Sequence, residues 1–234
     1  MSNTTAKKRS IDVVFCIDGT GSMYPCINKV KDNAKRFHLE FVSAMTELNS
    51  DIESMRIKVV VFRDYQCDGD KAMVESPFYE LPADQSEFDS FLAGVQAEGG
   101  GDGPENGYEA LYRAMCSDFV TGPNDRQVIA LFTDADALDL QLPDRVTNPK
   151  YPADMAKDLN DLQEKWMCLA QDSSLKLRER NKRLVIFAPA TTKYKAEIAD
   201  NFNRCIYEPV DMAAGLGDID FSAIIKVLAA SAST

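Results

Sequence analysis

The chain has 234 residues, of which 26 are Lys or Arg and 37 are Asp or Glu, so its formal net charge at pH 7 is −11. A chain of this length can bury one sizeable core, and we expect a single α/β domain. The negative charge disfavours nonspecific binding to nucleic acid or to an anionic membrane surface. Because no apolar run approaches the roughly 18 residues of a membrane-spanning helix, we also expect no membrane span.

The first ten residues are polar and lack the apolar core of a secretory signal. We predict a disordered leader over residues 1–10, one domain over residues 11–230 and a frayed tail over residues 231–234. The six cysteines stand singly and His38 is the one histidine, so the spacing typical of zinc sites is absent. Reduced thiols and a cytoplasmic location are therefore expected. The oligomeric state is not predicted by the sequence.

The first predicted strand leads into an oxygen-rich loop. Residues 11–17 are mostly apolar or β-branched, and the sequence Asp-Gly-Thr-Gly-Ser follows at residues 18–22. Asp18, Thr20 and Ser22 alternate along this loop, so one carboxylate and two hydroxyls can converge on one point. Oxygen ligands suit a hard cation such as Mg²⁺. Alternatively, the two hydroxyls serve only to cap the helix that begins near Tyr24.

Further along the chain, β-branched runs alternate with segments in which apolar residues recur every three or four positions. Helices are predicted over residues 27–48, 84–95, 108–115, 154–180, 194–202 and 221–228. Strands are predicted over residues 56–63, 73–75, 126–133, 184–188 and 204–207. This alternation is typical of a doubly wound, Rossmann-like α/β fold, in which a mostly parallel central sheet carries helices on both faces.

Two further predicted loops carry carboxylates. Asp102 lies in a glycine-rich segment, residues 98–105, and Asp134 follows the strand predicted over residues 126–133. The carboxyl ends of parallel strands meet at one edge of a sheet. We therefore predict a metal site that holds Mg²⁺ or Mn²⁺, and Ca²⁺ less readily. Its ligands are Asp18, Thr20, Ser22, Asp102 and Asp134.

Other interpretations of the acidic loop residues stay open. Asp102 also fits a helix N-cap, with Pro104 in the first turn and Glu105 in a capping box. Asp64 and Asp136 are weaker candidates that orient water around the metal or merely lie exposed at strand ends.

The sequence Val-Phe-Cys-Ile-Asp18-Gly-Thr20-Gly-Ser22-Met resembles the Asp-x-(Ser/Thr)-x-Ser motif of the von Willebrand factor A (vWA) domain, and Thr133-Asp134 resembles the third loop of that family. The predicted element order is similar over residues 11–230. Phe-Arg-Asp-Tyr and Gly-Gly-Gly-Asp-Gly-Pro-Glu are similar to intracellular and bacterial members. The resemblance implies a metal-ion-dependent adhesion site (MIDAS), whose cation accepts a carboxylate from a partner protein.

The chain departs from this family at the second loop, where a threonine is common and Asp102 is the nearest oxygen ligand. A direct carboxylate ligand would leave the cation less electrophilic. We hypothesise a partly self-satisfied site whose partner affinity is gated by residues 99–103. The predicted function is thus a cation-dependent protein-interaction module, not an enzyme, that docks a protein with an exposed Asp or Glu.

An alternative from another class is a metal-dependent phosphoesterase that uses Asp18 and Asp134. A haloacid-dehalogenase-type phosphatase is disfavoured, because Cys16 stands where the nucleophilic aspartate is needed. A serine hydrolase is disfavoured as well, since His38 lies within a predicted helix.

Two segments remain without an assigned role. Residues 137–152 form a long, proline-containing loop beside the predicted site, which is a lid, part of a docking surface or a plain insertion. A basic cluster at residues 176–183 is interpreted as the solvated end of a helix, because no basic stripe typical of nucleic-acid binding accompanies it. The basic residues of this cluster are Lys176, Arg178, Arg180, Lys182 and Arg183.

Overall fold

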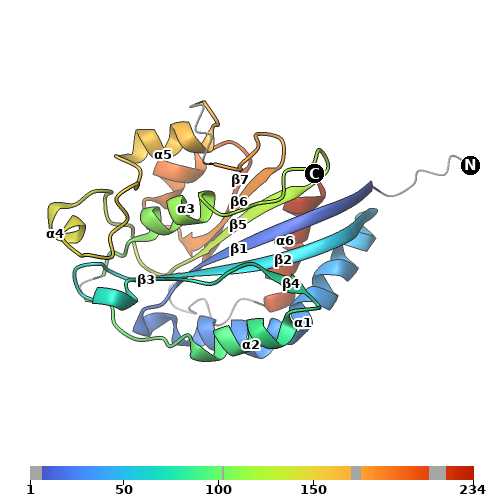
Figure 1. Ribbon diagram of the computed structural model, residues 1–234, viewed down its shortest axis with the longest axis horizontal. Helices are drawn as coiled ribbons and strands as arrows, with labels where there is room; N and C mark the ends of the chain where they lie inside the picture. The colour runs from blue at the N-terminus through green and yellow to red at the C-terminus, as the bar shows by residue number, and fades with distance from the viewer. Residues whose placement is uncertain (1–6, 102, 170–174, 211–219) are drawn as a thin grey trace, which may run out of the picture.

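A computed structural model describes residues 7–101, 103–169, 175–210 and 220–234. A seven-stranded sheet forms the centre of the molecule, in the order β3-β2-β1-β5-β6-β7, and β4 also pairs with β2 (Figure 1). All pairings are parallel except those of β3 and β4 with β2. The strands are β1 (Lys7–Asp18), β2 (Ser50–Phe62), β3 (Met73–Glu75), β4 (Tyr79–Leu81), β5 (Arg126–Phe132), β6 (Lys182–Pro189) and β7 (Cys205–Val210).

Helices cover both faces of the sheet, which confirms the predicted doubly wound α/β fold (Figure 1). One face packs against α1 (Tyr24–Glu47), α2 (Gln85–Gly94) and α6 (Phe221–Ser233). The other face packs against α3 (Gly107–Met115) and α5 (Leu159–Trp166). The shorter helical elements are η1 (Gly21–Met23), η2 (Gly69–Lys71), α4 (Pro143–Val146) and the π-helical turn η3 (Lys195–Ala199).

Side-chain alternation along the central strands builds the two cores. In β1, Val13 and Phe15 face α1, whereas Val14 and Cys16 face α3, because successive strand residues point to opposite faces. The helix predicted over residues 27–48 forms as α1, whose buried residues include Ile27, Phe37 and Phe41, whereas Leu48 follows α1 and is exposed. The sheet is thus covered by helices on both faces.

The long helix predicted over residues 154–180 is wrong. Among the described residues of this segment only α5 forms, and it begins where the Asp158 side chain accepts a hydrogen bond from the Asp161 backbone N–H at 2.8 Å. It ends before Cys168, whose φ of 55° lies in the left-handed region. Residues 175–181 lead into β6 without helical structure. The apolar periodicity did not reveal where α5 begins or where it ends.

Residues 7–10 and 231–233 lie in regular elements, which contradicts the leader and the tail predicted there. β1 begins at Lys7, so residues 7–10 belong to the sheet, and α6 continues to Ser233. The guanidinium of Arg9 explains both differences, because it is buried and donates from Nη1 to the Ala232 carbonyl at 3.0 Å. Residues 1–6 lie outside the described part of the chain.

The loop over residues 137–152 is fastened beside the end of β2. Arg145, in α4, is buried and donates to both carboxylate oxygens of Asp64, at 3.0 and 2.7 Å. Asn148 donates to the Tyr65 carbonyl at 2.8 Å, and the rings of Tyr65 and Tyr151 meet edge-on at 4.9 Å. The segment is therefore a packed loop with several specific anchors.

Candidate metal centre

The parallel pairing of β1 with β5 builds the floor of the candidate site. Ile17 pairs with Phe132, so Asp18 and Thr133 emerge side by side from the carboxyl edge of the sheet. The Thr133 hydroxyl donates to Asp18 Oδ2 at 2.7 Å. Both side chains are buried, which fixes the Asp18 carboxylate at the base of the loops above.

A continuous chain of hydrogen bonds links the two predicted loops. Thr20 donates to Asp18 Oδ1 from its backbone N–H at 3.0 Å and from its hydroxyl at 2.7 Å. The Thr20 and Ser22 hydroxyl oxygens are 3.3 Å apart, and Ser22 donates to Asp134 Oδ1 at 3.0 Å. Four of the five predicted ligands thus lie together, whereas Asp102 lies outside the described residues.

The glycine-rich second loop closes over Thr20. Glu98 donates its backbone N–H to the Gly19 carbonyl at 3.0 Å. Gly100 has a φ of 81°, and a Cβ there would lie 2.9 Å from Thr20 Cγ2, so only glycine fits. A hollow of about 250 Å³ remains between the loops. Its lining residues are Thr20, Gly21, Ser22, Gly99, Gly100, Gly101, Gly103, Glu105 and Ala135.

Glu105 lines this hollow, although the sequence suggested only a capping role for it. The residue is 2% exposed. Its backbone is fixed by hydrogen bonds with the Asp136 carbonyl and the Leu138 N–H. The capping alternative for Asp102 is wrong, because α3 begins at Gly107 with Asn106 as its N-cap.

Arg63 holds the loops together and was not predicted as a site residue. Its buried guanidinium donates to the carbonyls of Gly19 at 3.0 Å, Glu98 at 2.8 Å, Gln96 at 2.6 Å and Lys71 at 2.7 Å. A planar donor group with five N–H bonds is suited to such bridging. The Phe-Arg-Asp-Tyr sequence was the available signal, but nothing local in it indicates which carbonyls the arginine reaches.

The two weaker aspartate candidates serve the surrounding loops. Asp64 is fully buried and paired with Arg145. Asp136 accepts hydrogen bonds from the backbone N–H groups of Ala137 and Lys193, at 2.9 and 3.1 Å. Both carboxylates therefore stabilise loop conformations.

The electrostatics of the site centre on Asp18. Burial raises the pKa of this carboxyl to about 6, and the nearby charge of Asp134 acts in the same direction. Hydrogen bonds from Thr20 and Thr133 act in the opposite direction, since they stabilise the ionised form. A cation bound in the hollow would compensate this buried negative charge.

The donor set fits a hard cation. It consists of two carboxylates and two hydroxyls, and oxygen is the ligand type that Mg²⁺ and Mn²⁺ prefer. Within the described residues, no three Asp, Glu, His or Cys side chains gather to hold a metal. The hydroxyls of Thr20 and Ser22 would consequently supply part of any coordination.

The arrangement of two ligand-bearing loops at this sheet edge agrees with the family comparison. A profile described as the von Willebrand factor A domain matches residues 12–156, which is more than half of the sequence. This chain belongs to the vWA domain family. No curated protein matches the sequence of this vWA domain.

Solved structures share the fold at low sequence identity. The pilus adhesin SpaC from Lactobacillus rhamnosus GG has a TM-score of 0.58 at 12% identity, over 96% of this chain and 31% of the adhesin. The open conformation of this adhesin has a TM-score of 0.56 at 14% identity, over 96% of this chain and 30% of the adhesin. A von Willebrand factor type A structure from Catenulispora acidiphila has a TM-score of 0.51 at 14% identity, over 94% of this chain and 42% of the other chain. This vWA domain spans less than half of each of these chains.

Among the described residues, no helix of this vWA domain combines the length and the hydrophobicity needed to cross a bilayer.

Proposed function

We propose that this vWA domain binds Mg²⁺ or Mn²⁺ through Asp18, Thr20, Ser22 and Asp134 and uses the ion to dock a partner protein. The observation that carries the proposal is the 3.0 Å hydrogen bond from Ser22 to Asp134, which joins loops 112 residues apart in the sequence. Together with the Thr20 hydroxyl, it brings oxygen donors of both loops together beside the hollow that Thr20 and Ser22 line.

The proposed ligands form a buried inner layer and a more exposed outer layer. Asp18 is fully buried and orients the hydroxyls of Thr20 and Thr133. Ser22 is exposed and Asp134 is half-buried, so the outer donors face the surface. When bound, the cation would supply a Lewis-acidic position for a carboxylate, because two neutral hydroxyls leave its charge incompletely balanced.

The partner in this proposal presents an exposed Asp or Glu, and Asp102 contributes a further oxygen from the second loop. The description of SpaC as a pilus adhesin supports an interaction role for this fold. We place the protein in the cytoplasm, as in the intracellular members of the family. Buried free thiols at Cys16 and Cys26 support a reducing environment.

Metal binding is tested by isothermal titration of Mn²⁺ into the parent protein and two matched variants. Asp134→Asn should weaken binding at least roughly tenfold, because it removes a charged ligand. Asp139→Asn is the control, since Asp139 is exposed and pairs with Lys193 rather than with the site. Equal affinity in Asp134→Asn and the parent would contradict the proposed metal centre.

Partner docking is tested by recovering proteins from cell extract in Mg²⁺ and in EDTA. A specific partner should be retained by the parent and by Asp139→Asn in Mg²⁺ alone, and lost with Asp134→Asn. The same preparations are assayed with a generic phosphoester in Mg²⁺ and Mn²⁺. Turnover that disappears in Asp18→Ala would replace the docking proposal with the phosphoesterase alternative.

A further inference from the structure

The opposite edge of the sheet carries a row of arginines. Arg9, Arg126 and Arg183 lie at or near the starts of β1, β5 and β6, and Arg204 directly precedes β7. These four strands are neighbours in the sheet. We call these four residues the arginine row.

Register and alternation place three members of the arginine row on one face of the sheet. Arg126 pairs with Ile11, two residues after Arg9, and Arg183 pairs with Val128, two residues after Arg126. Ile11 and Val128 belong to the core beneath α1 and α6, so Arg9, Arg126 and Arg183 share that face. Four strands about 4.8 Å apart give the arginine row roughly 14 Å across the strands, and the offset of two residues between successive arginines of these three, ~6.6 Å along the strands, makes the row diagonal and longer than that.

Backbone carbonyls are the main partners of the arginine row. Arg9 donates to the Ala232 carbonyl and Arg183 to the Ser231 carbonyl, both at 3.0 Å, at the end of α6. Arg126 donates to the Asp125 carbonyl at 2.8 Å. The C-terminal dipole of α6 favours positive charge, but it amounts to only about half an elementary charge.

Carboxylates do not balance this charge in the described residues. Arg204 lies 3.7 Å from Glu179, whose other carboxylate oxygen also pairs with Lys182. For Arg9, Arg126 and Arg183, no ion pair within 4.0 Å occurs in the part of the chain that the structure describes. These three guanidinium groups therefore form no close ion pair among the described residues, and the nearby Asp125 carboxylate offsets only part of the charge around Arg126.

Two buried donors of the arginine row also lack a hydrogen-bond acceptor. The Nε atoms of Arg9 and Arg126 are buried without a partner among the described residues, and the two residues are only 7% and 8% exposed. Burial and the charges of Arg9, Arg183 and Arg204 lower the pKa of Arg126 to about 10. A buried guanidinium whose N–H group has no acceptor is stabilised by an anion that accepts a hydrogen bond from it.

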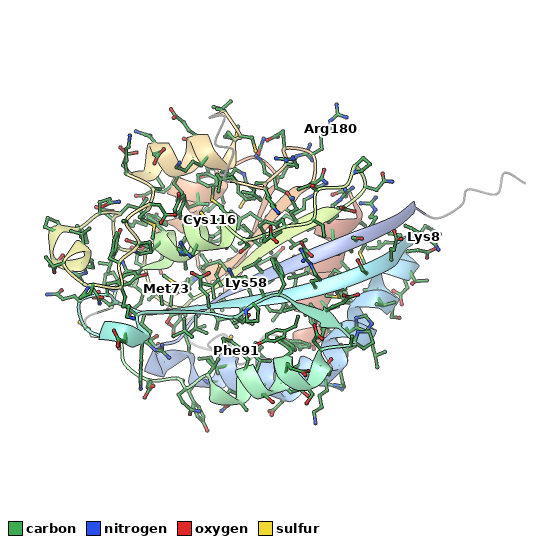
Figure 2. All side chains as sticks on the ribbon, in the orientation of Figure 1. Lys8, Lys58, Met73, Phe91, Cys116 and Arg180 are labelled. Atoms are coloured by element: carbon green, nitrogen blue, oxygen red, sulfur yellow. The ribbon has the colours of Figure 1, made fainter. Side chains whose placement is uncertain are left out.

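Exposed basic residues border the arginine row. Figure 2 shows Lys8 and Arg180 toward the end of the molecule where β1 begins, and Met73 toward the opposite end. The Arg180 carbonyl accepts a hydrogen bond from Arg183 at 3.0 Å. The prediction that residues 176–183 form the solvated end of a helix is wrong. The segment is a non-helical approach to β6 that adds Arg178 and Arg180 to the border of the row.

We propose that the arginine row binds a small, multiply charged phosphate-type oxyanion. Guanidinium groups donate parallel N–H bonds that match phosphate oxygens, and a row of this width suits linked phosphate groups better than a single one. The overall charge of the chain is −11, so this local excess of positive charge is opposite in sign to the chain as a whole. The site lies across the sheet from Asp18, so its occupancy does not depend on the proposed metal centre.

The test uses the full chain in EDTA at constant ionic strength, which keeps phosphate–metal complexes out of the measurement. Inorganic phosphate, pyrophosphate and tripolyphosphate are titrated calorimetrically, and thermal melting is followed in parallel. Tripolyphosphate should bind most tightly and raise Tm. Arg126→Met should weaken its binding at least tenfold. Arg36→Met is the matched control, since Arg36 is an exposed arginine on α1 paired with Glu40.

Arg204→Met replaces Arg126→Met if the latter does not fold, because the Arg204 side chain is 36% exposed and contributes little packing. Failure of tripolyphosphate to bind the parent would overturn the proposal. Equal binding by the parent and the folded arginine-row variant would also overturn it. Tighter binding of a single-stranded oligonucleotide than of tripolyphosphate, lost in the same variant, would replace the small anion by nucleic acid.

Discussion

The two edges of the sheet bury charges of opposite sign. At the carboxyl edge, Asp18 is surrounded by hydroxyl and N–H donors, whereas at the amino edge Arg9 and Arg183 lie against carbonyls that end α6. Parallel strands explain this difference, because one edge leads toward helix N-termini and the other receives helix C-termini. The polarity of the fold therefore decides which charge each edge can bury.

Three buried carboxylates near the carboxyl edge differ in how their charge is compensated. Asp64 has a guanidinium partner in Arg145. Glu109, in the first turn of α3, accepts a hydrogen bond from Tyr151 at 3.0 Å, and burial raises its pKa to about 7. Asp18 has only hydroxyl and backbone donors in the described residues. We infer that Asp64 is neutralised by an arginine, Glu109 by a proton and Asp18 by a metal ion.

The largest expected effect follows from removing Arg145, the partner of Asp64. Arg145→Met should lower the free energy of unfolding by about 3–5 kcal/mol, because Asp64 would remain buried without a counter-charge. Urea denaturation measures this loss. The double variant that adds Asp64→Asn should recover much of it. A change below about 1 kcal/mol in the single variant would show that Asp64 is not held by this pair.

Asp18→Asn should separate metal binding from stability. The variant should bind Mg²⁺ at least roughly 100-fold more weakly than the parent, because it removes the carboxylate at the base of the site. In EDTA at pH 7.5 it should be at least as stable as the parent, since an amide avoids burying a charge. Thermal melting with and without Mg²⁺ measures both effects. A Tm increase in Mg²⁺ equal to that of the parent would exclude Asp18 as a ligand.

Glu109→Gln tests the proton-bearing carboxylate. Because the folded state raises the pKa of Glu109 from 4.5 to about 7, folded protein binds this proton more tightly than unfolded chain. The stabilisation is fully present below pH 4.5 and is lost as the pH rises through 7. Glutamine resembles the protonated form of glutamate, so the variant and the parent should have similar free energies of unfolding near pH 4.5. At pH 8 the free energy of unfolding of the variant should exceed that of the parent by roughly 1–3 kcal/mol.

Denaturation curves at pH 4.5, 6 and 8 provide the measurement for Glu109. Glu47→Gln is the control, because Glu47 is an exposed residue at the end of α1. A stability difference that is independent of pH would show that Glu109 does not carry the proton.

The smallest expected effect concerns Asp102, which lies outside the described residues. Replacing it by the threonine common in the family should leave the cation more electrophilic. Asp102→Thr should therefore strengthen Mg²⁺-dependent partner binding by roughly threefold to tenfold. Partner affinity is measured in Mg²⁺ and in EDTA. Unchanged or weaker affinity would refute the idea that this carboxylate limits docking.

Local sequence patterns were sufficient for the candidate ligands. Asp18, Thr20 and Ser22 follow a strand within one short loop, and Asp134 directly follows another strand. The parallel topology expected from alternating strands and helices then places both loops at one edge. The helix over residues 154–180 could not be predicted correctly, because its start and end depend on single residues rather than on periodicity.

Contacts between distant residues were not predictable in the same way. Arg63 reaches the Gly19 carbonyl across 44 positions, and Arg145 reaches Asp64 across 81. A charged residue at a strand end has the same local pattern whether it is exposed, paired or aimed into a site. Burial and partner identity depend on strand order and loop packing, which the sequence pattern alone does not specify.

The sequence by itself determined the alternation of strands and helices and the oxygen-rich loop at residues 18–22, because both depend on residues close together in the chain. Only the tertiary structure decided how each buried charge is compensated. Sheet order brought Thr133 to Asp18, loop packing brought Arg145 to Asp64, and strand register aligned Arg126 and Arg183 in one row. Electrostatic interactions act through space, so the fold had to be known before these partners could be identified.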